Sequence, residues 1–178
     1  QKASFFSDML SEKSVELMKL AMDGSKSLEV TTPEETLLSQ AGSLASIAAA
    51  TSSVGIAILL STTLNARYKI SRALVASILF PYVIEDAKKY KAEKLKRIAV
   101  KMGASDENHS AEEAAQAFAD SIRQRLAKAN LPTRLKELSL TVDQLALVAE
   151  DAGQLDTMHG LPRSMKTDAL LDILKTAY

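Results

Sequence analysis

Residues 36–66 read TLLSQAGSLASIAAATSSVGIAILLSTTLNA, and no charged side chain occurs anywhere in this stretch. Its leucines, isoleucines and alanines are typical of helices that lie inside a protein. Gly55 interrupts the pattern, so we expect two buried helices, at about 36–53 and 55–65, that meet near this glycine. Small side chains such as Ala48, Ala49 and Ala50 would let these helices pack closely at the centre of a bundle.

A membrane-spanning segment is the alternative interpretation of this stretch, because it exceeds the roughly 20 residues that a helix needs to cross a bilayer. Hydroxyl side chains are frequent in it, however, and make it too polar for a typical span. They are Ser39, Ser43, Ser46, Thr51, Ser52, Ser53, Ser61, Thr62 and Thr63. The sequence therefore favours buried helices, and we expect no membrane as a partner.

The composition of the whole chain favours helix as well. Only six glycines and four prolines occur in 178 residues, aromatic residues make up 4%, and no segment alternates regularly between apolar and polar residues. Hydrophobic residues at 47% and charged residues at 25% are typical of a folded globular protein. We therefore predict an all-α fold, a single domain over residues 1–178 with about eight helices.

Local signals place the ends of these helices. Thr32 followed by Pro33 predicts one helix start, and Ser110 and Thr141 predict two others. Gly103 predicts a helix end, and Pro81 predicts a kink. The expected helices run from Ser7 or Ser11 to Met22 with an end at Gly24, from the Thr32 cap towards Thr51, and over about 55–65 and 72–88. A basic helical stretch from Lys88 to Arg97 continues through Ile98–Met102, and further helices are expected over about 110–130, 141–152 and 167–177.

Charge and cysteine content exclude several classes of function. Lysine plus arginine and aspartate plus glutamate number 22 each, so the net charge gives no reason to expect nucleic acid as a partner. The basic stretch from Lys88 to Arg97 contains interleaved acidic residues and is typical of a solvated helix face. The absence of cysteine excludes disulfides and thiolate metal sites, and it fits the cytoplasmic location that we expect.

Three segments together resemble one protein family. Leu131–Leu138 reads LPTRLKEL, Gly160–Arg163 reads GLPR and precedes a helix that ends in ILKTAY, and Val54–Pro81 contains Gly55, Arg72 and Pro81 in a regular frame. They are similar to the LPTRLRELG turn, the NPR element with its terminal helix, and the central motif of the iron-dependent (group III) alcohol dehydrogenase family. That central motif reads G-x-x-H-x-x-x-H, then about ten residues, then H-G-x-x-N-A-x-x-L-P, and the spacing here matches it without gaps.

The resemblance implies the fold of this family's C-terminal domain, a dehydroquinate synthase-like helical bundle. Members of the family pair such a domain with an N-terminal nucleotide-binding domain and bind a metal, usually iron or zinc, through one aspartate and three histidines. This chain, which opens on Gln1 without an initiator methionine, is then expected to be the C-terminal half of a longer protein. NAD(P) is expected only if a nucleotide-binding half precedes it, that half would be its main partner, and a homodimer is expected by analogy.

This chain departs from the motif at positions that bind the metal in the family. The first ligand histidine of the central motif falls on Ile58, the neighbouring cleft histidine on Thr62 and the last ligand histidine on Arg72. An isoleucine cannot coordinate a metal, and an arginine is a permanent cation that repels one. His109 and His159 lie in predicted loops at no ligand position, so we predict no metal site in this chain.

A polar cluster remains in the stretch that would line the family's cleft, consisting of Arg67, Tyr68, Lys69, Ser71 and Arg72, with Thr62 nearby. One hypothesis is that Arg72 places a fixed positive charge where the metal would lie and holds a carboxylate, a phosphate or a developing alkoxide. The alternative is that Arg72 faces solvent at a helix start and the cleft has lost its function. The sequence identifies no catalytic residue.

Three functions from different classes are compatible with these observations. The first is an alcohol dehydrogenase-like oxidoreductase that works without the usual metal. The second is a degenerate, non-catalytic relative that serves as a binding or scaffolding domain. The third is a helical interaction module whose resemblance to the family is accidental.

Overall fold

Helices account for all the regular structure in the computed structural model, which describes residues 3–23, 32–161 and 163–178. Within these residues there are seven α-helices, two 3₁₀ helices and no strand, which confirms the all-α prediction. The α-helices are α1 (Phe5–Asp23), α2 (Glu34–Ala50), α3 (Ile56–Tyr68), α4 (Arg72–Lys101), α5 (Ala111–Lys128), α6 (Val142–Gly153) and α7 (Thr167–Thr176). The 3₁₀ helices are η1 (Leu135–Leu138) and η2 (Asp156–Gly160).

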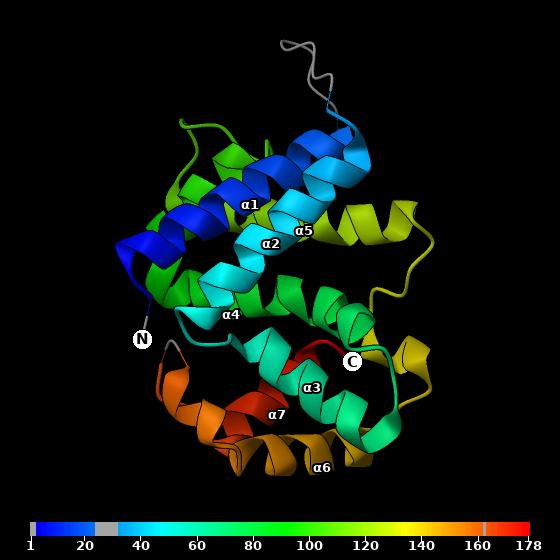
Figure 1. The fold of residues 1–178 in the computed structure, drawn as a ribbon. Helices are drawn as coiled ribbons and strands as arrows, with labels where there is room; N and C mark the ends of the chain where they lie inside the picture. The colour runs from blue at the N-terminus through cyan, green and yellow to red at the C-terminus, as the bar shows by residue number, and fades with distance from the viewer. Residues whose placement is uncertain (1–2, 24–31, 162) are drawn as a thin grey trace.

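The helices form layers on both sides of α4, the longest of them (Figure 1). On one side α1 and α2 lie next to each other, and on the other side lie α3, α6 and α7, while α5 packs along α4 itself. The larger apolar core is formed by α3, the first part of α4, α6 and α7. A smaller core lies between α4 and α5.

Two of the predicted helix starts have the geometry of a complete capping box. The Ser110 hydroxyl accepts a hydrogen bond from the Glu113 amide at 3.2 Å, and the Glu113 carboxylate accepts one from the Ser110 amide at 2.9 Å. Thr141 and Gln144 repeat this arrangement at the start of α6. Gly103 ends α4 with φ +68, a conformation that glycine adopts without steric cost. The predictions for these three helix ends are therefore confirmed.

The segment between α5 and α6 belongs to one of the family-like motifs, and it is tied to the end of the chain. The buried Leu135 donates its amide hydrogen to the carbonyl of Ala177 at 2.8 Å, and the Arg134 side chain donates to the carbonyl of Thr176 at 2.9 Å. The Glu137 carboxylate accepts hydrogen bonds from the amides of Thr133 and Arg134, which lowers its pKa. These contacts give the motif a structural role.

The prediction that both uncharged helices are buried is correct for α3 and wrong for α2. Seven residues of α3 are buried, whereas α2 buries only Leu37, Ala41 and Ala48. The hydroxyls of α2 explain how an uncharged helix tolerates water, because Ser43 and Ser46 donate to carbonyls one turn earlier in the same helix. Absence of charge therefore did not indicate burial here.

Two predicted features also need correction. Helix α2 begins at Glu34 with Pro33 as its N-cap, so Thr32 is not the cap. Pro81 lies within α4, and the kink predicted there falls at Lys91 instead, where non-helical backbone (φ −138, ψ 28) divides α4 into two helical parts. The predicted helix end at Gly24 falls outside the described residues. Among the helices that are described, none is both long enough and apolar enough to span a membrane.

Candidate functional site

A pocket of about 310 Å³ lies between the start of α3 and the first half of α4. Almost all of its walls are hydrocarbon. The residues that line it are Gly55, Ile56, Ala57, Ile58, Ala76, Ser77, Phe80 and Val83. Ile58 and Phe80 are 42% and 43% exposed, so the pocket is open to solvent along these two side chains. Such a lining suits an apolar group.

The one side-chain hydroxyl in this lining is already engaged. Ser77 Oγ donates to the carbonyl oxygen of Ala73 at 2.9 Å, within its own helix. No residue of the lining carries a charge. The pocket by itself therefore offers no group for general acid or base catalysis.

Ile58, which matches the first ligand histidine of the family's central motif, lies in the wall of this pocket. Thr62, one turn further along α3, is exposed and is not part of the lining. Ile58 therefore lies on a concave surface and Thr62 lies outside it. That the two positions belong to one functional cleft stays a prediction.

Arg67, Tyr68, Lys69 and Ser71 are each engaged elsewhere. Arg67 forms an ion pair with Asp151 of α6 at 3.4 Å, and the Tyr68 hydroxyl donates to the carbonyl of Gln144 at 3.3 Å. Lys69 Nζ donates to the carbonyl of Ala66 at 2.9 Å, and Ser71 caps α4 by accepting from the amide of Leu74. The predicted polar cluster therefore does not converge on a common point.

Arg72 differs from these neighbours. It is the exposed first residue of α4, and none of the ion pairs among the described residues includes it. It lies one turn before Ala76, which lines the pocket, and that separation is about 6 Å along the helix axis. Of the predicted cations, Arg72 is thus the one that lies one helical turn before a residue of the pocket lining.

The residues at these positions do not fit the family's metal. A divalent ion needs side chains with lone pairs, and Ile58 offers none, while the Arg72 guanidinium repels a cation. Across residues 3–23, 32–161 and 163–178, no three histidine, cysteine, aspartate or glutamate side chains come together in a way that could hold a metal ion. His109 lies 3.3 Å from Asp106 at the surface, and His159 lies in η2.

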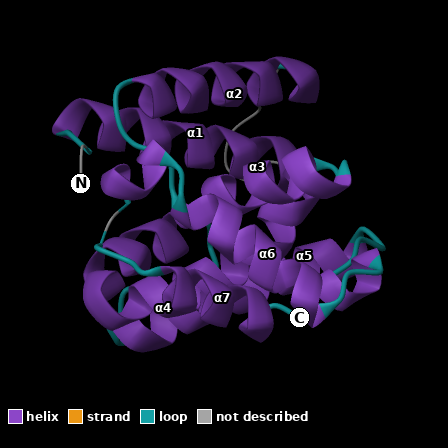
Figure 2. Cartoon of the chain, turned by 90° about the horizontal axis from the view of Figure 1, so that it is seen from below, coloured by secondary structure: helices purple, strands orange, loops and turns teal. Residues whose placement is uncertain are grey.

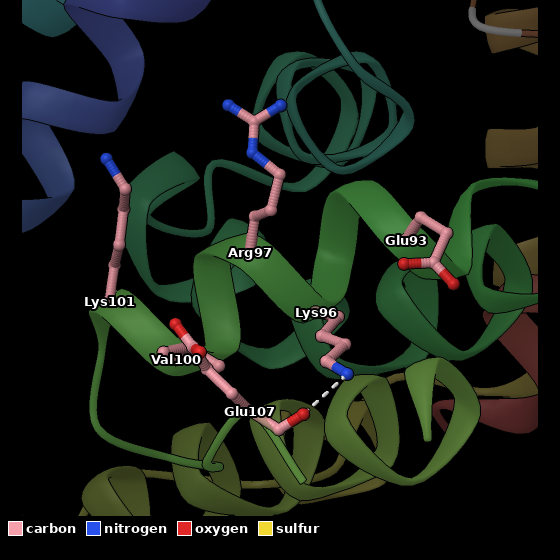
Figure 3. Close-up of a pocket in the computed structure, with 6 residues that line it drawn as sticks. All are labelled: Glu93, Lys96, Arg97, Val100, Lys101 and Glu107. Carbon is pink, nitrogen blue, oxygen red and sulfur yellow. Dashed lines mark hydrogen bonds between the residues drawn. The ribbon is translucent and has the colours of Figure 1, made fainter. Parts of the chain in front are cut away.

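Several lysines in the basic stretch of α4 are hydrogen-bonded or paired with neighbouring groups. Lys88 donates to the side chain of Gln116 at 2.8 Å, Lys94 pairs with Asp8 at 2.7 Å, and Lys96 donates to two backbone carbonyls before α5. Figure 3 shows a groove along this part of α4, in which Lys96 bonds to Glu107. These contacts favour a structural role over recognition of nucleic acid.

The chain matches a family model described as "Fe-containing alcohol dehydrogenase family, C-terminal" over residues 1–178. No curated protein matches it. Among solved structures, it is similar to a 1,3-propanediol oxidoreductase, with 19% identity, a TM-score of 0.89, and coverage of 100% of this chain and 47% of that one. An alcohol dehydrogenase from Oenococcus oeni shows 19% identity and a TM-score of 0.87, with coverage of 99% of this chain and 46% of that one.

A third similar structure is a sulfoacetaldehyde reductase from Bifidobacterium kashiwanohense in complex with NAD+. It is 17% identical, with a TM-score of 0.70 and coverage of 98% of this chain and 44% of that one. At these identities the likeness establishes the fold. The chain spans less than half the length of each of these relatives.

Proposed function

The chain belongs to the Fe-containing alcohol dehydrogenase family as its C-terminal helical domain, and we propose that it is the helical half of an oxidoreductase that does not bind the usual metal. In this proposal a nucleotide-binding half precedes it, supplies NAD(P) and completes the cleft, and the whole protein forms a homodimer. Hydride would pass between the nicotinamide and an alcohol or aldehyde carbon. The third hypothesis, an accidental resemblance, is excluded because the family model matches the whole chain.

The observation that carries the proposal is the environment of Ile58. This residue takes the place of a ligand histidine, and it lies in the wall of a pocket whose other residues are also uncharged. Metal in this family would polarise the substrate oxygen, and that role needs another positive group when the metal is absent. Arg72, exposed and one turn from the pocket, is the residue that we assign to this role.

Metal content tests the first part of the proposal. The protein expressed from its complete reading frame is incubated with Fe²⁺ or Zn²⁺, desalted and analysed by inductively coupled plasma mass spectrometry. We expect far less than one equivalent of bound metal, because two ligand positions are lost. Stoichiometric metal in this protein would contradict the proposal.

Nicotinamide binding to the same full-length protein separates the two remaining functions. Saturable binding of NAD⁺ or NADP⁺, followed by fluorescence or calorimetry, is expected of the oxidoreductase. A degenerate binding or scaffolding domain would show none. The presence of Ile58 at a ligand position is the observation that favours this second candidate, since a lost ligand is also what a non-catalytic relative would show.

Replacing Arg72 with alanine tests its assigned role. We expect this variant to lose the chemical-shift changes that inorganic phosphate or acetate produces around α4 in an NMR titration, because the fixed charge that holds the anion is removed. Lys69→Ala is the matched control, since Lys69 Nζ is bonded to the carbonyl of Ala66 in α3. Equal anion binding by Arg72→Ala and the unmodified protein would show that Arg72 is only a surface residue.

A further inference from the structure

Helices α1 and α2 pack against each other through small buried residues. Ser7 and Ser14 are the buried residues of α1, and Ala41 and Ala48 of α2 are buried with the same heptad spacing. Ser14 Oγ donates to the carbonyl of Ala41 at 2.8 Å. The two helices run antiparallel and form a separate edge of the molecule in both views (Figures 1 and 2). We refer to them below as the α1–α2 pair.

The α1–α2 pair takes no part in the two apolar cores. In the described residues, every member of those cores lies at or beyond Ile56 in the sequence. Apolar residues of α1 such as Phe5, Met9 and Met22 are instead 87%, 47% and 51% exposed. Attachment of the pair to the rest of the fold must therefore depend on other interactions.

Ion pairs supply that attachment. Acidic side chains of α1 meet basic side chains of α4 and α5 at distances that include 2.7 Å for Asp8–Lys94, 2.7 Å for Glu16–Lys101 and 2.9 Å for Glu12–Lys101. Glu12 also pairs with Arg97, and Asp23 receives two hydrogen bonds from Arg125, at 2.8 and 2.7 Å. In Figure 3, Arg97 and Lys101 extend from α4 away from Glu107.

Most of these groups remain in contact with water, which makes the attachment sensitive to salt. Lys94 and Arg97 keep 40% and 65% of their side-chain surface exposed. Exposed ion pairs contribute about 0–1 kcal/mol each. The screening length falls from about 30 Å at 0.01 M salt to about 3 Å at 1 M. Apolar cores are not weakened in this way, so salt acts selectively on the α1–α2 pair.

The pair is connected directly to the candidate pocket. Helix α2 ends at Ala50, and residues 51–54 connect it to Gly55 and Ile56, which line the pocket. This connection packs closely against Gly160, because a Cβ added to Gly160 would lie only 3.0 Å from the side chain of Ser53. Movement of the pair would therefore act on the wall of the pocket through residues 51–55.

We propose that the α1–α2 pair is a separately opening unit, held closed on α4 and α5 by ion pairs, and that its opening alters the pocket at the start of α3. The pair opens while the two apolar cores stay folded. Its effect on the pocket rests on the proposed function, whereas the opening itself does not.

Hydrogen exchange measured by mass spectrometry tests this proposal, with the protein in 0.02 M and 1 M NaCl at constant pH. Amides of α1 and α2 are expected to exchange at least about tenfold faster in high salt, while those of α5 and α6 are unchanged. The double variant Arg97→Gln/Lys101→Gln should show fast exchange in α1 and α2 already at low salt. Further salt should then have little effect.

Lys89→Gln/Lys136→Gln is the matched control, since it removes the same charge from two exposed sites that do not pair with α1. Protection of α5 and α6 within each sample reports whether a variant is folded. Equal protection of α1, α2, α5 and α6 at both salt concentrations would overturn the proposal. Metal and nicotinamide play no part in this measurement, so its outcome is independent of the test of function.

Discussion

Replacing Leu60 with alanine is expected to lower the free energy of unfolding by about 3 kcal/mol. Leu60 is 0% exposed and lies in the core shared by α3, α4, α6 and α7. The substitution removes buried methyl groups and leaves a cavity that rigid neighbouring helices fill only in part. At about 2–4 °C per kcal/mol for a protein of this size, the midpoint of thermal unfolding should fall by roughly 6–12 °C.

Urea denaturation followed by circular dichroism measures the effect, with an unchanged slope expected for both proteins. Leu38→Ala in α2 is the control, because Leu38 is 40% exposed and belongs to neither core. It should cost less than about 1 kcal/mol. If the two variants lost similar stability, Leu60 would not have the central position in the core that we assign to it.

Helix ends were predictable where a short local pattern determines them. Ser110 with Glu113 satisfies free backbone groups within four residues, and Gly103 adopts a conformation that other residues avoid. Such signals do not depend on the rest of the fold. The effect of a proline does depend on it, and the non-helical backbone of α4 is found at Lys91 and not at Pro81.

Burial of α2 could not be predicted from the sequence. Its lack of charge is equally compatible with an internal helix and with a surface helix whose hydroxyls bond to its own backbone. Two features of α1 determine the position of α2. The small residues of α1 pack against those of α2, and the acidic residues of α1 pair with α4. Asp8, Glu12 and Glu16 recur every four residues on one face, a signal that was present but not recognised.

The candidate site was predicted only in part, for a geometric reason. Motif spacing led to Ile58, which lines a pocket. Arg67, Lys69 and Ser71 are neighbours in sequence, but each contacts a different partner. Helix α3 ends at Tyr68, and Lys69 adopts φ 58, which separates the side chains on its two sides. Phe80 and Val83 were missed, although with Ala76 they follow the spacing of one helix face.

Replacing Arg163 with alanine is expected to destabilise the protein by about 2 kcal/mol. This is less than the cost of breaking a fully buried ion pair, because the Arg163 side chain is 35% exposed. Arg163 belongs to the family-like segment before α7, and its guanidinium donates three hydrogen bonds to Asp86 of α4, at 2.9, 3.0 and 3.2 Å. The Asp86 side chain is only 11% exposed. Without Arg163, Lys89 at 3.6 Å is the remaining cation paired with this carboxylate among the described residues.

Arg163→Lys should recover only part of the loss, because an ammonium group keeps the charge but cannot form the bidentate contact. Lys89→Ala, which removes the exposed and longer contact, should change stability by less than about 0.5 kcal/mol. A double-mutant cycle with Asp86→Asn isolates the interaction, and we expect a coupling energy above about 1 kcal/mol from urea denaturation. A coupling energy near zero would mean that Arg163 does not hold the C-terminal segment on α4. Arg163 would then need a different role, such as one in the cleft, to explain its position in the family-like motif.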